Sequence, residues 1–129
     1  MTDAVATITA FLNAWGPTKG DLRGAYRDYL AEGAIWENVG LMTTKGVDEA
    51  LTLMTQFEQS AGIWAFKVDI LHIAGQGDVV LTERVDRRIT KDGHVAKDGI
   101  RVMGVFEVKA GKITAWRDYF DTAPFLPKK

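Results

Sequence analysis

Residues 79–121 decide the fold, and they read VVLTERVDRRITKDGHVAKDGIRVMGVFEVKAGKITAWRDYFD. Within this stretch apolar and polar residues alternate with a period of two, which is typical of β-strands that bury one face. The same period begins near Ile63, and the strands that it predicts are Trp64–Ala74, Val79–Thr90, Ile100–Val108 and Lys112–Asp121. Short segments that contain glycine separate these strands and have the composition of turns. The sequence therefore predicts an antiparallel meander.

The residues before this region follow a helical period instead. Three apolar stripes recur at a spacing of three and four: Val5, Ile8, Phe11, Leu12 and Trp15; Leu22, Ala25, Tyr26, Tyr29 and Leu30; Val47, Ala50, Leu51, Met54 and Phe57. Glycines end the predicted helices, with Gly33 as the break after the second and Gly62 near the end of the third. A short strand is predicted at Ala34–Asn38. Helices that precede consecutive strands indicate an α+β fold, with the helices on one face of a curved sheet.

Length and charge set the broad class of protein. The chain has 129 residues and is 47% hydrophobic, so we expect a single domain over residues 1–129. No stretch reaches the roughly 18–20 apolar residues of a membrane span, and no secretory signal opens the chain, so a cytoplasmic protein without membrane contact is expected. The 16 basic and 17 acidic residues give a net charge of -1, which argues against nucleic-acid binding.

Scarce residues narrow the chemistry further. The chain has no cysteine, which excludes thiolate metal sites and a cysteine nucleophile. Ser60 is its only serine and lacks the motif of a serine nucleophile. His72 and His94 stand in different contexts and cannot form a three-ligand metal site. An enzyme built on this chain would therefore use carboxylates, Arg, Asn, Tyr or Trp, without a metal.

The strand Val79–Thr90 has two faces of different character. One face carries Val79, Leu81, Glu83, Val85, Arg87 and Ile89, and the other carries Val80, Thr82, Arg84, Asp86 and Arg88. Simple patterning buries the first face and leaves the second as a solvated ladder of alternating charge. The alternative is that the second face lines a cavity, because both faces of a sheet can be covered.

The strand at the end of the chain favours a buried acid. Asp118 shares a face with Trp116 and Phe120, and a carboxylate between large rings is costly to ionise unless a partner stabilises it. Such desolvation tunes acid–base groups, although a strand-end aspartate that reaches water is the alternative. Trp36 and Asn38 likewise share a face of the short strand. Asn38 either holds a water or polar ligand or caps a turn.

Three segments resemble the limonene-1,2-epoxide hydrolase family: Thr82–Asp86 (TERVD), Gly104–Val108 (GVFEV) and Gly111–Asp121 (GKITAWRDYFD). The resemblance extends to the helical opening and to Ile35–Asn38. It implies an NTF2-like (nuclear-transport-factor-2-like) and SnoaL-like cone, in which three N-terminal helices pack on a strongly curved mixed sheet around a pocket. It also implies a cofactor-independent homodimeric enzyme that adds water to a hydrophobic epoxide and gives a vicinal diol.

The resemblance assigns roles to four residues. Asp86 would be the general acid, Asp118 the general base, and Arg84 the bridge between them, while Asn38 would position the attacking water. Two aspartates and one arginine carry a net charge of −1, which is expensive to bury and favours one shared proton. That sharing leaves a carboxylic acid beside a carboxylate, the pairing that epoxide opening needs.

The chain departs from the family at Trp36, where the family usually has a tyrosine that orients the water. An indole can donate a hydrogen bond but cannot accept one, so Trp36→Tyr should raise turnover if the lost contact limits the rate. Arg88 is a second departure and either contacts a polar substrate or points out past the rim. Strand parity and the resemblance together predict the substrate-binding residues Trp36, Leu51, Met54, Ile100, Val102 and Phe125.

Two other functions remain open from the residues alone. A ketosteroid-isomerase-like enzyme would also use an aspartate base and a protonated aspartate. A small-molecule-binding protein without activity could share the same fold, because a fold does not decide function. The set formed by Arg84, Asp86 and Asp118 favours the hydrolase, because neither alternative needs an arginine between two carboxylates.

Overall fold

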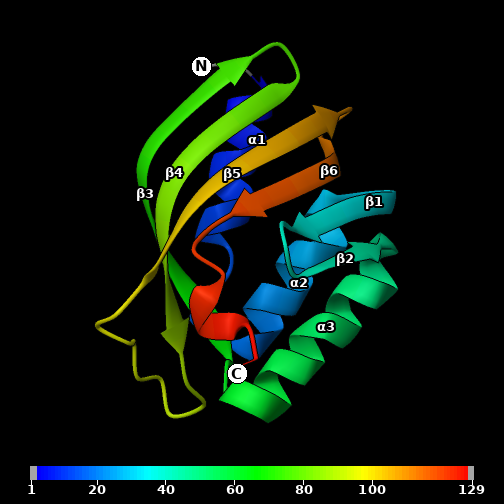
Figure 1. The fold of residues 1–129 in the computed structure, drawn as a ribbon. Coiled ribbons are helices and arrows are strands. Elements are labelled where there is room, and N and C mark those ends of the chain that lie inside the picture. The colour runs from blue at the N-terminus through cyan, green and yellow to red at the C-terminus, as the bar shows by residue number, and fades with distance from the viewer. Residues whose placement is uncertain (1–2, 128–129) are drawn as a thin grey trace.

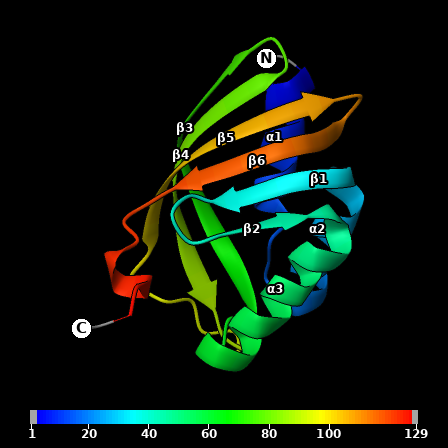
Figure 2. The ribbon, with the colours of Figure 1, turned by 45° about the vertical axis from the view of Figure 1, so that its right-hand side comes forward.

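The computed structural model describes residues 3–127, and over this range the chain forms one six-stranded sheet and three α-helices. The elements are α1 (Asp3–Asn13), α2 (Lys19–Tyr29), β1 (Leu30–Asn38), β2 (Met42–Lys45), α3 (Gly46–Ala61), β3 (Ala65–Gln76), β4 (Val79–Ile89), β5 (Ile100–Lys109), β6 (Lys112–Tyr119) and the 3₁₀ turn η1 (Ala123–Phe125). The sheet is strongly curved, and the three helices pack against the side toward which it bends (Figure 1; Figure 2).

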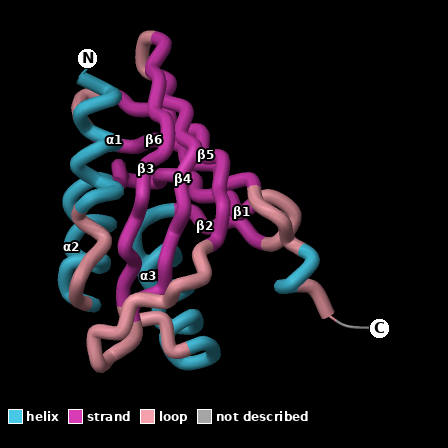
Figure 3. Tube along the Cα trace, turned by 90° about the vertical axis from the view of Figure 1, so that its left-hand side faces the viewer, coloured by secondary structure: helices cyan, strands magenta, loops and turns pink. Residues whose placement is uncertain are grey.

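The sheet is mixed, with the strand order β2-β1-β6-β5-β4-β3. Strands β3 to β6 form the predicted antiparallel meander. Strand β1 then pairs with β6 in parallel, so segments from the two ends of the chain lie side by side. In the tube view, strands gather on one side and α1 and α2 stand beside them (Figure 3). The predicted α+β fold is confirmed.

The predicted and observed ends of β3 to β6 differ by at most two residues, and the largest differences lie around β1 and β2. Strand β1 starts at Leu30, directly after α2, so Leu30 is not helical and Gly33 lies inside the strand. Gly33 has a φ of 72°, and the β1–β6 register shifts around it, which marks an irregularity within the strand rather than a break between elements. Strand β2 was not predicted, because its four residues are too few to show a period.

An aromatic cluster fills the interior between helices and sheet. Trp116 of β6 is its centre, and its ring lies near those of Phe11, Trp15, Tyr26, Trp36 and Phe106. The indole of Trp36 stacks on that of Trp116, with centroids 4.6 Å apart and planes at 11°. These large buried rings contribute much of the apolar area removed from water, and they fix the orientation of the β1 and β6 side chains that follow them.

The two faces of β4 are reversed relative to simple patterning. Val80, Thr82, Arg84 and Asp86 are buried, whereas Leu81 is 49% exposed. The reason is that the helices cover the concave side of the sheet, so Thr82, Arg84 and Asp86 lie in the interior and Leu81 lies outside. Arg88 is exposed, consistent with a position past the rim. Within residues 3–127 no helix is long and apolar enough to cross a membrane.

Candidate active site

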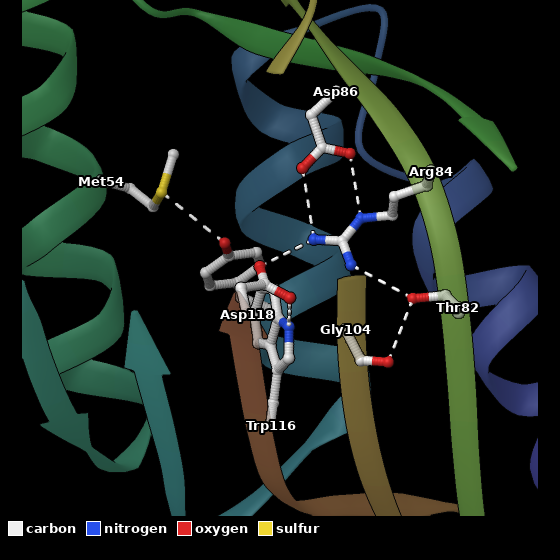
Figure 4. Close-up of polar contacts among 8 residues, drawn as sticks. Met54, Thr82, Arg84, Asp86, Gly104, Trp116 and Asp118 are labelled. Carbon is white, nitrogen blue, oxygen red and sulfur yellow. Dashed lines mark hydrogen bonds and ion pairs between the residues drawn. The ribbon is translucent and has the colours of Figure 1, made fainter. Parts of the chain in front are cut away.

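Arg84 is the centre of a buried polar cluster. Its side chain is fully buried and forms two hydrogen bonds to Asp86, from Nε to Oδ1 at 2.9 Å and from Nη2 to Oδ2 at 3.2 Å. Nη2 also donates to Oδ2 of Asp118 at 2.7 Å. Both aspartates are almost completely buried. The guanidinium therefore lies between the two carboxylates, as Figure 4 shows.

A glycine lets this cluster form across two strands. Arg84 and Asp86 share a face of β4, whereas Asp118 lies on β6, with β5 between them. Gly104 of β5 pairs with Thr82 on one side and with Asp118 on the other. A Cβ at position 104 would lie 2.4 Å from Nη1 of Arg84 and 2.9 Å from Oδ1 of Asp118. The guanidinium thus occupies the space that any other residue would fill.

The side chains of Trp116 and Thr82 and the carbonyl group of Gly104 complete the hydrogen bonds of the cluster. The indole Nε1 of Trp116 donates to Oδ1 of Asp118 at 2.7 Å. Both oxygens of Asp118 are therefore hydrogen-bond acceptors, one from a neutral indole and one from a cation. Nη1 of Arg84 donates to Oγ1 of Thr82 at 3.3 Å, and this hydroxyl donates in turn to the carbonyl oxygen of Gly104 at 3.4 Å. Trp116 and Thr82 were not predicted as site residues.

Burial and charge set the protonation behaviour of the cluster. Burial raises the pKa of Asp86 to about 6, and the negative charge of Asp118 adds to this effect while Arg84 opposes it. Burial also opposes the positive charge of Arg84, but the two carboxylates outweigh it and raise the pKa of the guanidinium. Arg84 therefore remains a cation, and Asp86 can hold a proton up to a pH of about 6.

A cavity of about 310 Å³ opens onto this cluster. Asp86, Asp118 and Asn38 lie in its wall, together with five predicted substrate-binding residues: Trp36, Met54, Ile100, Val102 and Phe125. Leu51 does not line this cavity; it is half-buried and packs against the core. It lies one helical turn before Met54, and the α3 residues in the wall are Met54, Phe57, Ser60 and Ala61. Tyr26 and Phe57 also line the cavity but were not predicted as site residues, because their helical spacing is typical of the core.

Strand β1 brings two more side chains to the cavity. In the parallel ladder Trp36 pairs with Trp116 and Asn38 with Asp118, so the predicted water-holding amide lies beside the predicted base. The Nε1 of Trp36 and the Nδ2 of Asn38 are buried without a hydrogen-bond partner among the described residues. Two donors are thus left unused in the wall next to the cluster.

The described part of the chain offers no ligand set for a metal. Within residues 3–127 no group of three or more His, Cys, Asp or Glu side chains is placed to hold a metal ion. The polar groups of the cavity wall are two carboxylates, an amide, two hydroxyls and three indole N–H groups, with the guanidinium between the carboxylates. This arrangement can give and take protons, and it can hold a neutral ligand with a polar atom.

The fold belongs to the NTF2-like and SnoaL-like class of α+β cones with an interior pocket. An NTF2-like protein of unknown function from Burkholderia pseudomallei is similar, with a TM-score of 0.75 at 18% identity over 97% of this chain and 95% of that chain. A SnoaL-like protein from a Jannaschia species has a TM-score of 0.73 at 16% identity, over 98% and 94% of the two chains. At these identities the similarity is one of fold.

Sequence comparison defines the family within this class. The profile of the limonene-1,2-epoxide hydrolase catalytic domain matches residues 2–128, and the chain belongs to this family. It is 39% identical to the epoxide hydrolase EphG of Mycobacterium tuberculosis over 114 residues, which cover 88% of this chain and 70% of EphG. The structure of an M. tuberculosis epoxide hydrolase described as limonene-epoxide-hydrolase-like has a TM-score of 0.73 at 35% identity, over 93% and 84% of the two chains.

Proposed function

We propose that the protein adds water to a hydrophobic epoxide and releases a vicinal diol, without a cofactor. Asp86 is the general acid, Asp118 the general base and Arg84 the bridge between them. The observation that carries this proposal is that both carboxylates bind the buried Arg84 and lie in the wall of one cavity. Family membership supports the reaction class, and the chemistry of the cluster supports the roles.

The proposed reaction moves one proton at each end of the cluster. A water molecule loses a proton to Asp118 while its oxygen bonds to a ring carbon of the epoxide. The bond between that carbon and the ring oxygen breaks, and the oxygen takes the proton of Asp86. The sum is the addition of one water molecule, with no bond between enzyme and substrate. The proton then returns from Asp118 to Asp86 before the next turnover.

The cluster suits this division of roles. Both oxygens of Asp118 accept hydrogen bonds, from Trp116 and Arg84, and these contacts hold the proposed base in one orientation. Among residues 3–127, Asp86 accepts hydrogen bonds from Arg84 alone, one on each oxygen. Burial raises the pKa of Asp86 to about 6, so this carboxyl group is the one that can supply a proton. Arg84 holds the acid and base in fixed positions and offsets one negative charge, so positioning and proton transfer supply the catalysis.

The cavity wall supports a small apolar substrate. Ile100, Val102, Met54 and Phe125 would contact its hydrocarbon part, and Trp36 closes the wall beside the cluster. A volume of about 310 Å³ is at the small end of the range of about 300–1,000 Å³ for ligand pockets. Asn38 lies beside Asp118 in the ladder and would hold the attacking water.

The direct test is diol formation by the wild-type protein. Cyclohexene oxide and limonene-1,2-epoxide are suitable probes, with the diols measured by gas chromatography against a no-enzyme blank. We expect kcat/KM to decline as the pH rises through about 6, because the raised pKa of Asp86 keeps this acid protonated only up to that range. A rate that instead rises through this range, or no diol from any hydrophobic epoxide, would contradict the proposal.

The outer face of the sheet supports a homodimer. Leu71 of β3, Leu81 of β4, Met103 of β5 and Tyr119 of β6 are each between 46% and 52% exposed. We propose that a second copy of the chain covers this face, as the family resemblance implies. Leu81→Lys should then shift the protein toward the monomer in analytical ultracentrifugation. Leu126→Lys, at a side chain that is 48% exposed near the C-terminus, is the control. A wild-type monomer would contradict the dimer.

A further inference from the structure

Tyr26 places a hydroxyl in the cavity wall that the proposed reaction does not use. It lies on α2 and is only 2% exposed, and it lines the same cavity as Asp86 and Asp118. Two rings hold it from the sides. Its centroid is 5.4 Å from that of Trp36, with planes at 88°, and 5.8 Å from that of Trp116, with planes at 79°. Packing therefore fixes the direction in which the hydroxyl points.

The hydroxyl of Tyr26 is only partly satisfied. It donates its hydrogen to the Sδ of Met54 at 3.6 Å, and thioether sulfur is a weak acceptor (Figure 4 shows Met54 and this contact). No donor to the phenolic oxygen is found among residues 3–127. Burial, with the charges of Asp118 and Asp86, raises the pKa of Tyr26 well above its ordinary value, so the group remains a neutral phenol. The phenolic oxygen therefore has free lone pairs in the cavity wall.

An attacking water in this cavity needs two acceptors. One of its hydrogens goes to Asp118, the proposed base. The unpaired Nδ2 of Asn38 would donate to the water oxygen, so the second hydrogen of the water still requires an acceptor if the water is to have one orientation. Trp36 on β1 cannot provide it, because an indole has a donor and no acceptor. The phenolic oxygen of Tyr26 meets the requirement, since its own hydrogen is already directed to the sulfur of Met54.

We propose that Tyr26 is a positioning residue whose oxygen accepts a hydrogen bond from the attacking water. Met54 holds the hydroxyl hydrogen away from the water, so that the lone pairs face it. In this chain Tyr26 of α2 would therefore supply the phenol that orients the water, because the side chain at position 36 of β1 is an indole. The inference rests on the proposed hydrolase function, and it concerns the orientation of the water rather than the proton transfer itself.

The test is Tyr26→Phe, which removes one oxygen and keeps the ring contacts. We expect kcat for cyclohexene oxide to fall on the order of tenfold while KM changes less than about twofold, because the lost contact acts on the water and not on the epoxide. Thermal unfolding should stay unchanged, since within the described residues the hydroxyl bonds to the weakly accepting sulfur of Met54 alone. Tyr29→Phe is the matched control, because Tyr29 packs on Phe11 with centroids 5.7 Å apart and lies outside the cavity wall. It should leave kcat unchanged.

A rescue experiment separates positioning from a structural role. Trp36→Tyr in the Tyr26→Phe background puts a phenol on β1 and should recover most of the kcat that Tyr26→Phe loses. A Tyr26→Phe variant with wild-type kcat, or with a change in KM alone, would overturn the inference while the proposed function stands. A wild-type protein that forms no diol would instead contradict the proposed function.

Discussion

Asp118→Asn is expected to lower kcat/KM for epoxide hydrolysis by about 10²–10⁴-fold, the usual contribution of a general base. The amide cannot take a proton from water, yet it has nearly the shape of the carboxylate, and its oxygen can still accept a hydrogen bond from Trp116 or Arg84. Asp86→Asn should cause a loss of similar size, because the amide has no acidic proton to give to the epoxide oxygen. Diol formation is the measurement for both variants.

A matched control makes this prediction specific. Asp121→Asn changes an exposed aspartate three residues from Asp118. Within the described chain, the carboxylate of Asp121 accepts a hydrogen bond only from the backbone N–H of Ala123. It should retain wild-type activity. Circular dichroism and thermal unfolding should show all three variants folded. Diol formation that persists in Asp118→Asn or Asp86→Asn would exclude the proposed acid–base pair.

Arg84→Met is expected to reduce the free energy of unfolding by about 3–5 kcal/mol at neutral pH, as measured by urea denaturation. Methionine fills part of the space but leaves Asp86 and Asp118 buried without a cation. The loss should shrink as the pH falls, because protonation removes the charges that the variant cannot compensate. Activity should also be lost, since the variant no longer holds the two carboxylates in place.

Arg87→Met provides the comparison on the same strand. Its Nε donates to Oδ2 of Asp69 at 2.9 Å, but the two side chains are 30% and 37% exposed. A pair at this exposure contributes less than about 1 kcal/mol, because solvent screens it. If Arg84→Met and Arg87→Met lose equal free energy of unfolding, burial of the Arg84 cluster is not the cause of the loss in Arg84→Met.

The sequence predicted the elements of the fold better than their pairing. The period of two located β3 to β6 because each is long and joined to the next by a short turn. The parallel pairing of β1 with β6 could not be predicted from local pattern, since it joins residues about eighty positions apart. Its consequence is functional, because this pairing puts Asn38 beside Asp118.

The site was harder to predict from physical pattern than from resemblance. Alternation assigned the polar face of β4 to solvent, because the pattern cannot show that helices cover that side. The resemblance placed Arg84, Asp86 and Asp118 together, and the structure brings them into contact. Gly104 was one indication of the site in the sequence that the prediction did not use. A glycine inside a strand weakens the strand and often marks a close approach of another group.

The gap at Gly104 has a consequence for attempts to redesign the protein. Position 104 supplies no reactive atom, yet a single methyl group there would meet three side-chain atoms of the cluster within 3 Å. A mutagenesis library aimed at new substrates should therefore keep this codon constant. Ile100 and Val102, on the same strand and in the cavity wall, are the positions at which substitutions should change the substrate preference of the proposed hydrolase.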